Sequence, residues 1–151
     1  MIDRLEELVA LLEELLGSGF DVDRYTATAG EPAAPSGACD AVWAWIASVE
    51  DRRAFVDDCL TVTDVTYRYR IDVCYPENDD GRDQTDAQHL ATVDKLYGMM
   101  EAVWCGLVAE KDAGALLSSP CDYVRILPLE VQQRSGGIVS ALGGVVAQFP
   151  C

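Results

Sequence analysis

Six cysteines and a single histidine are the residues whose chemistry could make this chain reactive. They are Cys39, Cys59, Cys74, Cys105, Cys121, Cys151 and His89. Zinc sites usually bring two ligands close together in the sequence, whereas the nearest pair, Cys59 and Cys74, is fifteen residues apart. An even number allows disulfides, but the sequence cannot choose among the pairings, and a reducing cytosol disfavours them all. We therefore expect reduced, mostly buried cysteines and no metal site.

Catalytic pairings are equally sparse. Any Cys–His or Ser–His pair would have to use His89, which we expect to be a polar surface residue at the start of a helix. None of the 26 acidic residues stands inside an apolar run, where burial would raise its pKa for acid–base work. The two glycine motifs that bind phosphate, G-x-x-x-x-G-K and G-x-G-x-x-G, do not occur. Asp79, Asp80 and Asp83 with Gly81 do not have the spacing of a calcium-binding loop. We expect neither an enzyme nor a cofactor.

Composition and charge narrow the class of protein further. The 151 residues fit one domain, 1–151, and half of them are apolar. The net charge of −15 makes binding to a phosphate backbone improbable. No apolar run is long enough to span a membrane, and the charged start, with glutamates between its leucines, does not resemble a secretory signal. These features predict a protein that stays in the cytosol where it is made.

Two helices are predicted to position the remaining elements. Residues 2–16 place six apolar residues on one face, and Gly17 and Gly19 end the helix. This stripe could dock a partner, but we expect it to cover the chain's own sheet. Residues 86–112 form a long helix, with Thr85 as its cap and Gly114 at its end. Its expected buried stripe is Leu90, Val93, Leu96, Tyr97, Met100, Val103, Trp104 and Leu107.

Strict alternation marks residues 59–75 as the clearest strand. Val65, Tyr67, Tyr69, Ile71, Val73 and Tyr75 share one face, and Asp64, Thr66, Arg68, Arg70 and Asp72 share the other. The polar face is either solvated or in contact with a neighbouring subunit. Residues 20–25 are a weaker strand, and 41–49 suit a helix or a strand, of which we prefer the strand.

Turn and loop composition completes the predicted fold. Residues 122–134 and 138–149 form a hairpin across Ser135-Gly136-Gly137, and Gly143-Gly144 indicates a bulge or a close approach of another chain. Residues 26–38 and 76–84 are loops, and 50–58 are a charged link. The predicted fold is α+β: an antiparallel sheet packed by an N-terminal helix and one long helix, with a C-terminal β-hairpin.

Several local sequences resemble a known family of proteins. They are Cys39-x-x-Val42-x-Ala44, the strand from Val65 to Pro76, Ala102-Val103-Trp104-Cys105, Cys121-Asp122-Tyr123-Val124 and Gly136-Gly137-Ile138-Val139. Together with the order of elements, they are similar to the head-to-tail connector proteins of long-tailed, siphovirus-type bacteriophages that infect actinobacteria. Within that set the chain looks most like a tail terminator, over residues 39–149.

The resemblance implies a structural virion protein, assembled in the host cytoplasm and located in the tail or neck. Tail terminators form a homo-hexameric ring that ends growth of the tail tube and joins tail to head, so the implied partners are the tail tube protein and the head-completion or stopper protein. Genomic DNA passes through the lumen without specific binding, and an acidic lumen would repel it. No reaction, cofactor or membrane is implied.

Ring closure needs two different patches on each subunit. We expect them on the polar strand face and the loops, and the candidate residues for contacts with a subunit or the tail tube are Arg68, Arg70, Asp72, Asp79, Asp80, Arg82 and Asp83. Three alternatives stay open: another neck component such as a head-completion protein, a non-catalytic acidic interaction protein, and a small enzyme that uses His89 or a cysteine.

Overall fold

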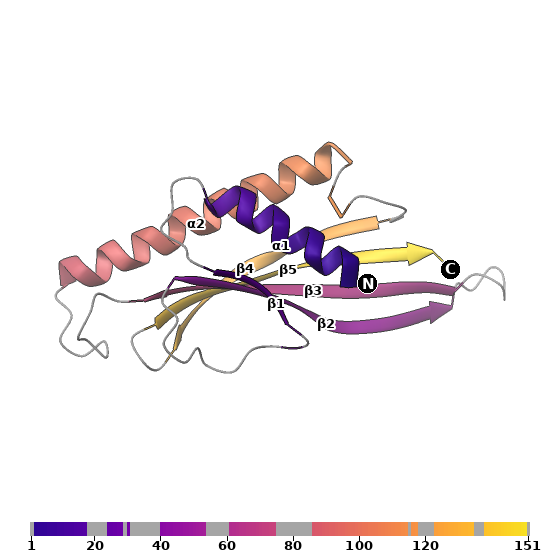
Figure 1. Cartoon of the computed structure of the whole chain (residues 1–151), viewed down its shortest axis with the longest axis horizontal. Helices are drawn as coiled ribbons and strands as arrows, with labels where there is room; N and C mark the ends of the chain where they lie inside the picture. Colours follow the sequence, from indigo (N-terminus) through magenta and orange to yellow (C-terminus); the bar gives the residue numbers. More distant parts are fainter. Residues whose placement is uncertain are drawn as a thin grey trace.

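Two helices lie on one face of a five-stranded sheet (Figure 1). The computed structural model describes residues 2–17, 24–28, 30, 40–53, 61–74, 86–114, 116–117, 123–134 and 138–150. The elements are α1 (Ile2–Gly17), β1 (Arg24–Thr28), β2 (Ala41–Arg53), β3 (Thr61–Cys74), α2 (Asp86–Asp112), β4 (Tyr123–Arg134) and β5 (Ile138–Pro150). The α+β class is therefore confirmed.

The sheet is mixed, so the prediction of a purely antiparallel sheet is wrong. The strand order is β1-β2-β3-β5-β4, and every neighbouring pair is antiparallel except β1 and β2. Parallel neighbours need a connection of about a dozen residues to bring the chain back to the same edge. The sequence provides that length between Thr28 and Ala41, in the stretch interpreted above only as a loop.

Most predicted strands are present, with shifted ends. Residues 41–49 are a strand, as preferred, but β2 continues through Arg53 into the expected link. Of the strand expected at 20–25, residues 20–23 lie outside the described residues, and the last two belong to β1, Arg24–Thr28, which continues into the expected loop 26–38. The C-terminal pair β4 and β5 is antiparallel with three residues between the strands, as the hairpin prediction requires. Its register shifts between Leu127 and Glu130, next to Pro128, which has no N–H to donate to the ladder.

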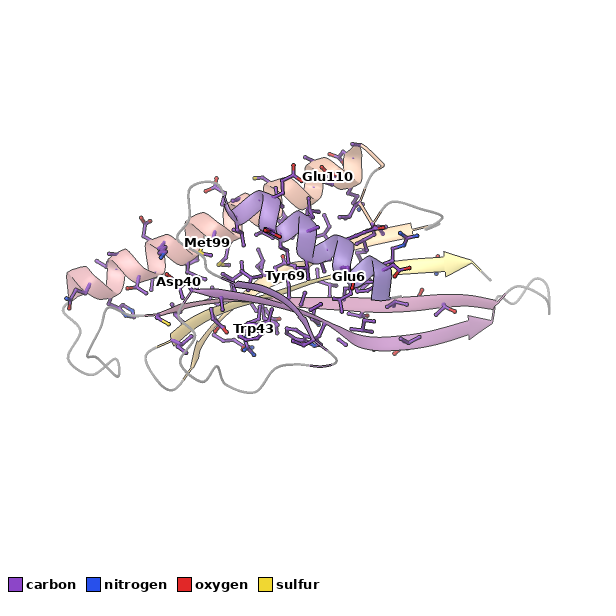
Figure 2. All side chains as sticks on the ribbon, viewed as in Figure 1. Glu6, Asp40, Trp43, Tyr69, Met99 and Glu110 are labelled. Atoms are coloured by element: carbon purple, nitrogen blue, oxygen red, sulfur yellow. The ribbon has the colours of Figure 1, made fainter. Side chains whose placement is uncertain are left out.

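The core lies between the helices and one face of β3. Val65, Tyr67, Tyr69, Ile71 and Val73 are all buried, as the alternation predicts. Leu5, Leu8, Leu12 and Leu16 of α1 are buried over them, while Leu15 and Val9 are half-buried. Figure 2 shows Tyr69 and Met99 on the side of the sheet that carries the helices. The apolar stripe of α1 thus covers the chain's own sheet, as expected, and is not left free to dock a partner.

Helix α2 is rotated relative to the prediction. Its buried stripe is Thr92, Leu96, Met99, Val103 and Leu107. Leu90, Tyr97 and Trp104 were expected in the core but are 66%, 53% and 39% exposed. Both stripes have helical spacing, so periodicity alone cannot choose between them. The contact between Gly106 and α1 decides which stripe is buried. A Cβ added to Gly106 would lie 2.3 Å from Cδ2 of Leu15, so this side of α2 lies directly against α1.

The end of α2 and its contact with the sheet depend on backbone conformations rare for most residues. Gly114 has φ +71°, the left-handed conformation with which a glycine ends a helix, as predicted. Asp40 has φ +52°, just before β2. Its carboxylate accepts hydrogen bonds from Nζ of Lys95 at 2.8 Å and from the backbone N–H of Cys74 at 3.4 Å. Asp40 therefore joins α2, β2 and the end of β3.

Of the two cysteines in the described ranges, Cys74 contradicts the expectation of reduced thiols, and Cys105 meets it without being buried. Cys74 is disulfide-bonded, although all cysteines were expected to be reduced. Cys105 is free but exposed on α2, although a buried position was expected. Cys105 is exposed because the rotation of α2 turns its side of the helix to solvent.

Gly143 provides the space for the Tyr69 ring. A Cβ at Gly143 would lie 2.5 Å from Cζ and from the hydroxyl oxygen of Tyr69, and 2.7 Å from Cδ2 of Leu129. We expect Gly143→Ala to lower the free energy of unfolding by about 1–3 kcal/mol, because the packed ring must move. Gly30→Ala is the control, since nothing lies within 4 Å of its added Cβ. Urea unfolding followed by circular dichroism measures both, and equal stability of the two variants would contradict the packing.

Tyr69 carries a buried hydroxyl that has no hydrogen-bond partner in the described part of the chain. Burial raises the pKa of Tyr69 above its ordinary value. We expect Tyr69→Phe to match or exceed the wild type in stability at pH about 7, by up to about 1 kcal/mol, because a desolvated donor is removed.

The advantage of Tyr69→Phe should grow above pH about 10, where tyrosine ionises in the unfolded chain but Tyr69 keeps its proton in the folded one. Ionisation of residue 69 in the unfolded chain then lowers the stability of the wild type but not of the variant. The effects of the other tyrosines are the same in both proteins and cancel in the comparison. Urea titrations at pH about 7 and about 11 measure the difference. A variant clearly less stable than the wild type at both pH values would show that the hydroxyl is satisfied.

Candidate functional site: the sheet face opposite the helices

The sheet face opposite the helices carries a polar network centred on Asp72. Nε of Arg70 donates to both Asp72 oxygens, at 2.9 and 3.1 Å. Nε1 of Trp43 donates to Oδ2 at 2.9 Å, and Oγ of Ser140 donates to Oδ1 at 2.5 Å. The register explains the cluster, because Trp43 is paired with Arg70 and Ser140 with Asp72. Figure 2 shows Trp43 on the side of the sheet away from α1 and α2.

Burial changes the interpretation of this part of the face. Arg70, Asp72 and Ser140 have no exposed surface, and Trp45 of the same face is only 4% exposed. The expectation of a solvated face is therefore wrong for Arg70 and Asp72. A buried ion pair overcomes its desolvation only when further hydrogen bonds satisfy its atoms. Trp43 and Ser140 supply them for the Asp72 carboxylate, whereas Nη2 of Arg70 is buried without a hydrogen bond in the described part of the chain. In the chain by itself Arg70, Asp72 and Ser140 offer no surface to a partner.

The other half of the same face is hollowed and polar. A hollow of about 240 Å³ is lined by Ser48, Glu50, Asp64, Thr66, Arg125, Val146 and Gln148, from strands β2, β3, β4 and β5. Nε2 of Gln148 donates to Oδ1 of Asp64 at 3.1 Å, across the β3–β5 pair. Glu50 is exposed and lies opposite Asp64 in the register. We call this half of the face, together with Arg68, Leu127 and Leu142, the open patch.

Two cations of the open patch have no ionic partner. Arg68 is half-buried and Arg125 is exposed, and neither makes a hydrogen bond or ion pair with any residue in the described ranges. Leu127, Leu142 and Val146 beside them are half-buried. The open patch therefore combines unpaired positive charge with partly exposed apolar surface, which is typical of a surface that contacts another macromolecule.

Among the described residues, His89 and the free Cys105 are not brought together. His89 is exposed on α2, as expected, and Cys105 lies sixteen residues later on the same helix, about 24 Å away along the axis. They cannot form a nucleophile–base pair within this chain. Among the described residues, no group of three or more His, Cys, Asp or Glu side chains could hold a metal ion.

The predicted interface residues divide into three sets. Arg68 lies in the open patch, and Arg70 and Asp72 lie in the buried network. Asp79, Asp80, Arg82 and Asp83 lie outside the described residues, as does the loop 76–84 that contains them. Sequence reasoning missed Trp43, Ser140 and Arg125. The position of Trp43 on the polar side of its strand was the available signal for the Asp72 network. Arg125 belongs to the open patch because β4 lies beside β5 in the sheet, and periodicity does not reveal strand order.

No family model matches this chain, and no curated protein does. Within the described residues, neither helix is long and apolar enough to cross a membrane.

The Asp72 network predicts a large effect for a small change. Asp72→Asn removes the carboxylate that faces the buried Arg70 guanidinium, and we expect it to lower the free energy of unfolding by about 3 kcal/mol. Glu13→Gln, on an exposed position of α1, is the matched control and should change stability by less than about 0.5 kcal/mol. Chemical unfolding of the two variants measures the difference, and similar stabilities would show that the network does not stabilise the fold.

Proposed function

We propose that the chain is a structural subunit of a long-tailed bacteriophage, assembled into a hexameric ring at the head-proximal end of the tail. As a tail terminator it ends growth of the tail tube and provides the surface that joins tail to head. The likeness of residues 39–149 to head-to-tail connector proteins supports this proposal, as does the α+β fold with two helices and a C-terminal hairpin.

The observation that carries the proposal is a pair of different uncovered patches on opposite layers of one small domain. The open patch lies on the sheet, and the exposed apolar residues Leu90, Tyr97 and Trp104 lie on α2. A closed ring is built from heterologous contacts, in which each subunit uses two different surfaces. A chain with two such patches on a compact domain fits that requirement.

The charge of the chain is compatible with DNA passing through the ring. The net charge of −15 gives each subunit a strongly negative field. Acidic residues lining a lumen would repel the phosphate backbone and keep the genome from adhering during packaging and ejection. The function requires shape and charge from this chain, and no step in which a bond is made or broken.

Electron micrographs of phage assembled without this protein test the proposal. We expect tails much longer than in the wild type, because nothing stops polymerisation of the tube, and few tails joined to heads. Supplying the protein from a plasmid should restore the normal length. Tails of normal length beside heads that leak DNA would contradict the terminator role and favour a head-completion role. Normal virions would exclude both.

A further inference from the structure

Helix α2 presents an apolar stripe that the rest of the described chain leaves uncovered. Leu90, Tyr97 and Trp104 are each seven residues from the next, so they lie in line over about 21 Å of helix. Gly106 faces α1 and Leu96, Met99 and Val103 face the sheet, so this stripe lies on the remaining, outer side of α2. An aligned tyrosine and tryptophan are the kind of residues that bury well in protein interfaces.

Two acidic residues follow one side of the stripe. Asp94 and Glu101 are exposed and also seven residues apart, about 10.5 Å along the axis. Neither makes a hydrogen bond or ion pair with any described residue. The outer side of α2 is therefore an apolar line bordered by two unpaired negative charges.

The open patch, which also contains the acidic Glu50 and Asp64, carries two arginines at a similar spacing. Arg68 is paired with Gly144 and Arg125 with Val146, so the two arginines are two strands and two residues apart. Standard sheet spacings put their Cα atoms about 12 Å apart. Two arginines on one layer of the molecule thus equal in number, and are similar in separation and opposite in sign to, the two acids on the other layer. Leu127, Leu142 and Val146 are partly exposed and offer apolar surface to the apolar stripe of α2.

We propose that the outer side of α2 in one copy of this chain docks on the open patch of the next copy, with Asp94 and Glu101 against Arg68 and Arg125. The inference rests on the ring of the preceding subsection and names its subunit contact. A two-fold pairing of α2 with α2 would bring the same acids against each other, which costs binding energy. A heterologous contact avoids that repulsion and can close a ring.

Glu50 and Asp64 fix the position of the docked helix. Glu50 lies on β2 and Asp64 lies on β3, four residues before Arg68, and Asp64 accepts a hydrogen bond from Gln148. If α2 shifted toward β2, its acids would meet these two carboxylates, and like charges at an interface are repelled. The docked helix must therefore run from Arg68 on β3 across β5 to Arg125 on β4, away from Asp64 at the other end of the patch on β3.

Complementary charge reversal tests the contact. One variant carries Asp94→Arg and Glu101→Arg on α2, and the other carries Arg68→Glu and Arg125→Glu on the open patch. Each variant alone sets like charges against each other, so we expect its self-association to weaken by about a hundredfold or more. In an equal mixture, every contact between unlike variants joins opposite charges, so rings should form with alternating subunits.

The matched control carries Glu13→Arg and Glu14→Arg, two exposed acids of α1, and should assemble as the wild type does. Sedimentation velocity and native mass spectrometry measure the assemblies. Rescue in the mixture also shows that both variants fold. A variant that assembles alone like the wild type, a mixture that stays monomeric, or a monomeric wild type would each overturn the contact. Overlong tails in phage lacking the protein would still support the ring function if the contact alone failed.

Discussion

The two helices cover only one face of the sheet, and the rest of the structure depends on that constraint. Alternation along β3 puts its large apolar side chains on the covered face and its charged ones on the other. The two ends of the opposite face then differ in burial. At one end Asp72 is enclosed in a network that makes a buried ion pair tolerable, and at the other end Arg68 and Arg125 keep unpaired charge at the surface. One end of this face is thereby buried within the domain, while the other end stays exposed.

Close approaches at two glycines determine which surfaces are left. Gly106 lets α1 pack against α2 and so turns Leu90, Tyr97 and Trp104 outward, and Gly143 lets the Tyr69 ring lie flat against β5. With a larger residue at Gly106, α2 would have to move away from Leu15 or rotate. The position of the exposed stripe of α2 is therefore a consequence of core packing. The same packing places that stripe and the open patch on separate layers of the domain.

Local patterning predicted much of this fold and little of the site. The long helix, the strand containing Val65–Val73 and the hairpin are set by periodicity and turn residues close together in the chain, and they are where expected. The parallel pairing of β1 with β2 depends on a connection whose direction no local pattern encodes. The burial of Arg70 and Asp72 depends on Trp43 and Ser140, which adjacent strands bring together. The outward side of α2 depends on Leu15, far away in the sequence, because two apolar stripes of equal spacing compete.

The central claim is that the chain works by shape, as one of several identical subunits around a hole. The most direct test is the mass and image of the assembly isolated from phage tails or formed by the purified protein. The account predicts a closed hexamer with an open centre. A chain that is solitary in both settings, with a small metabolite held by converging polar groups, would contradict it.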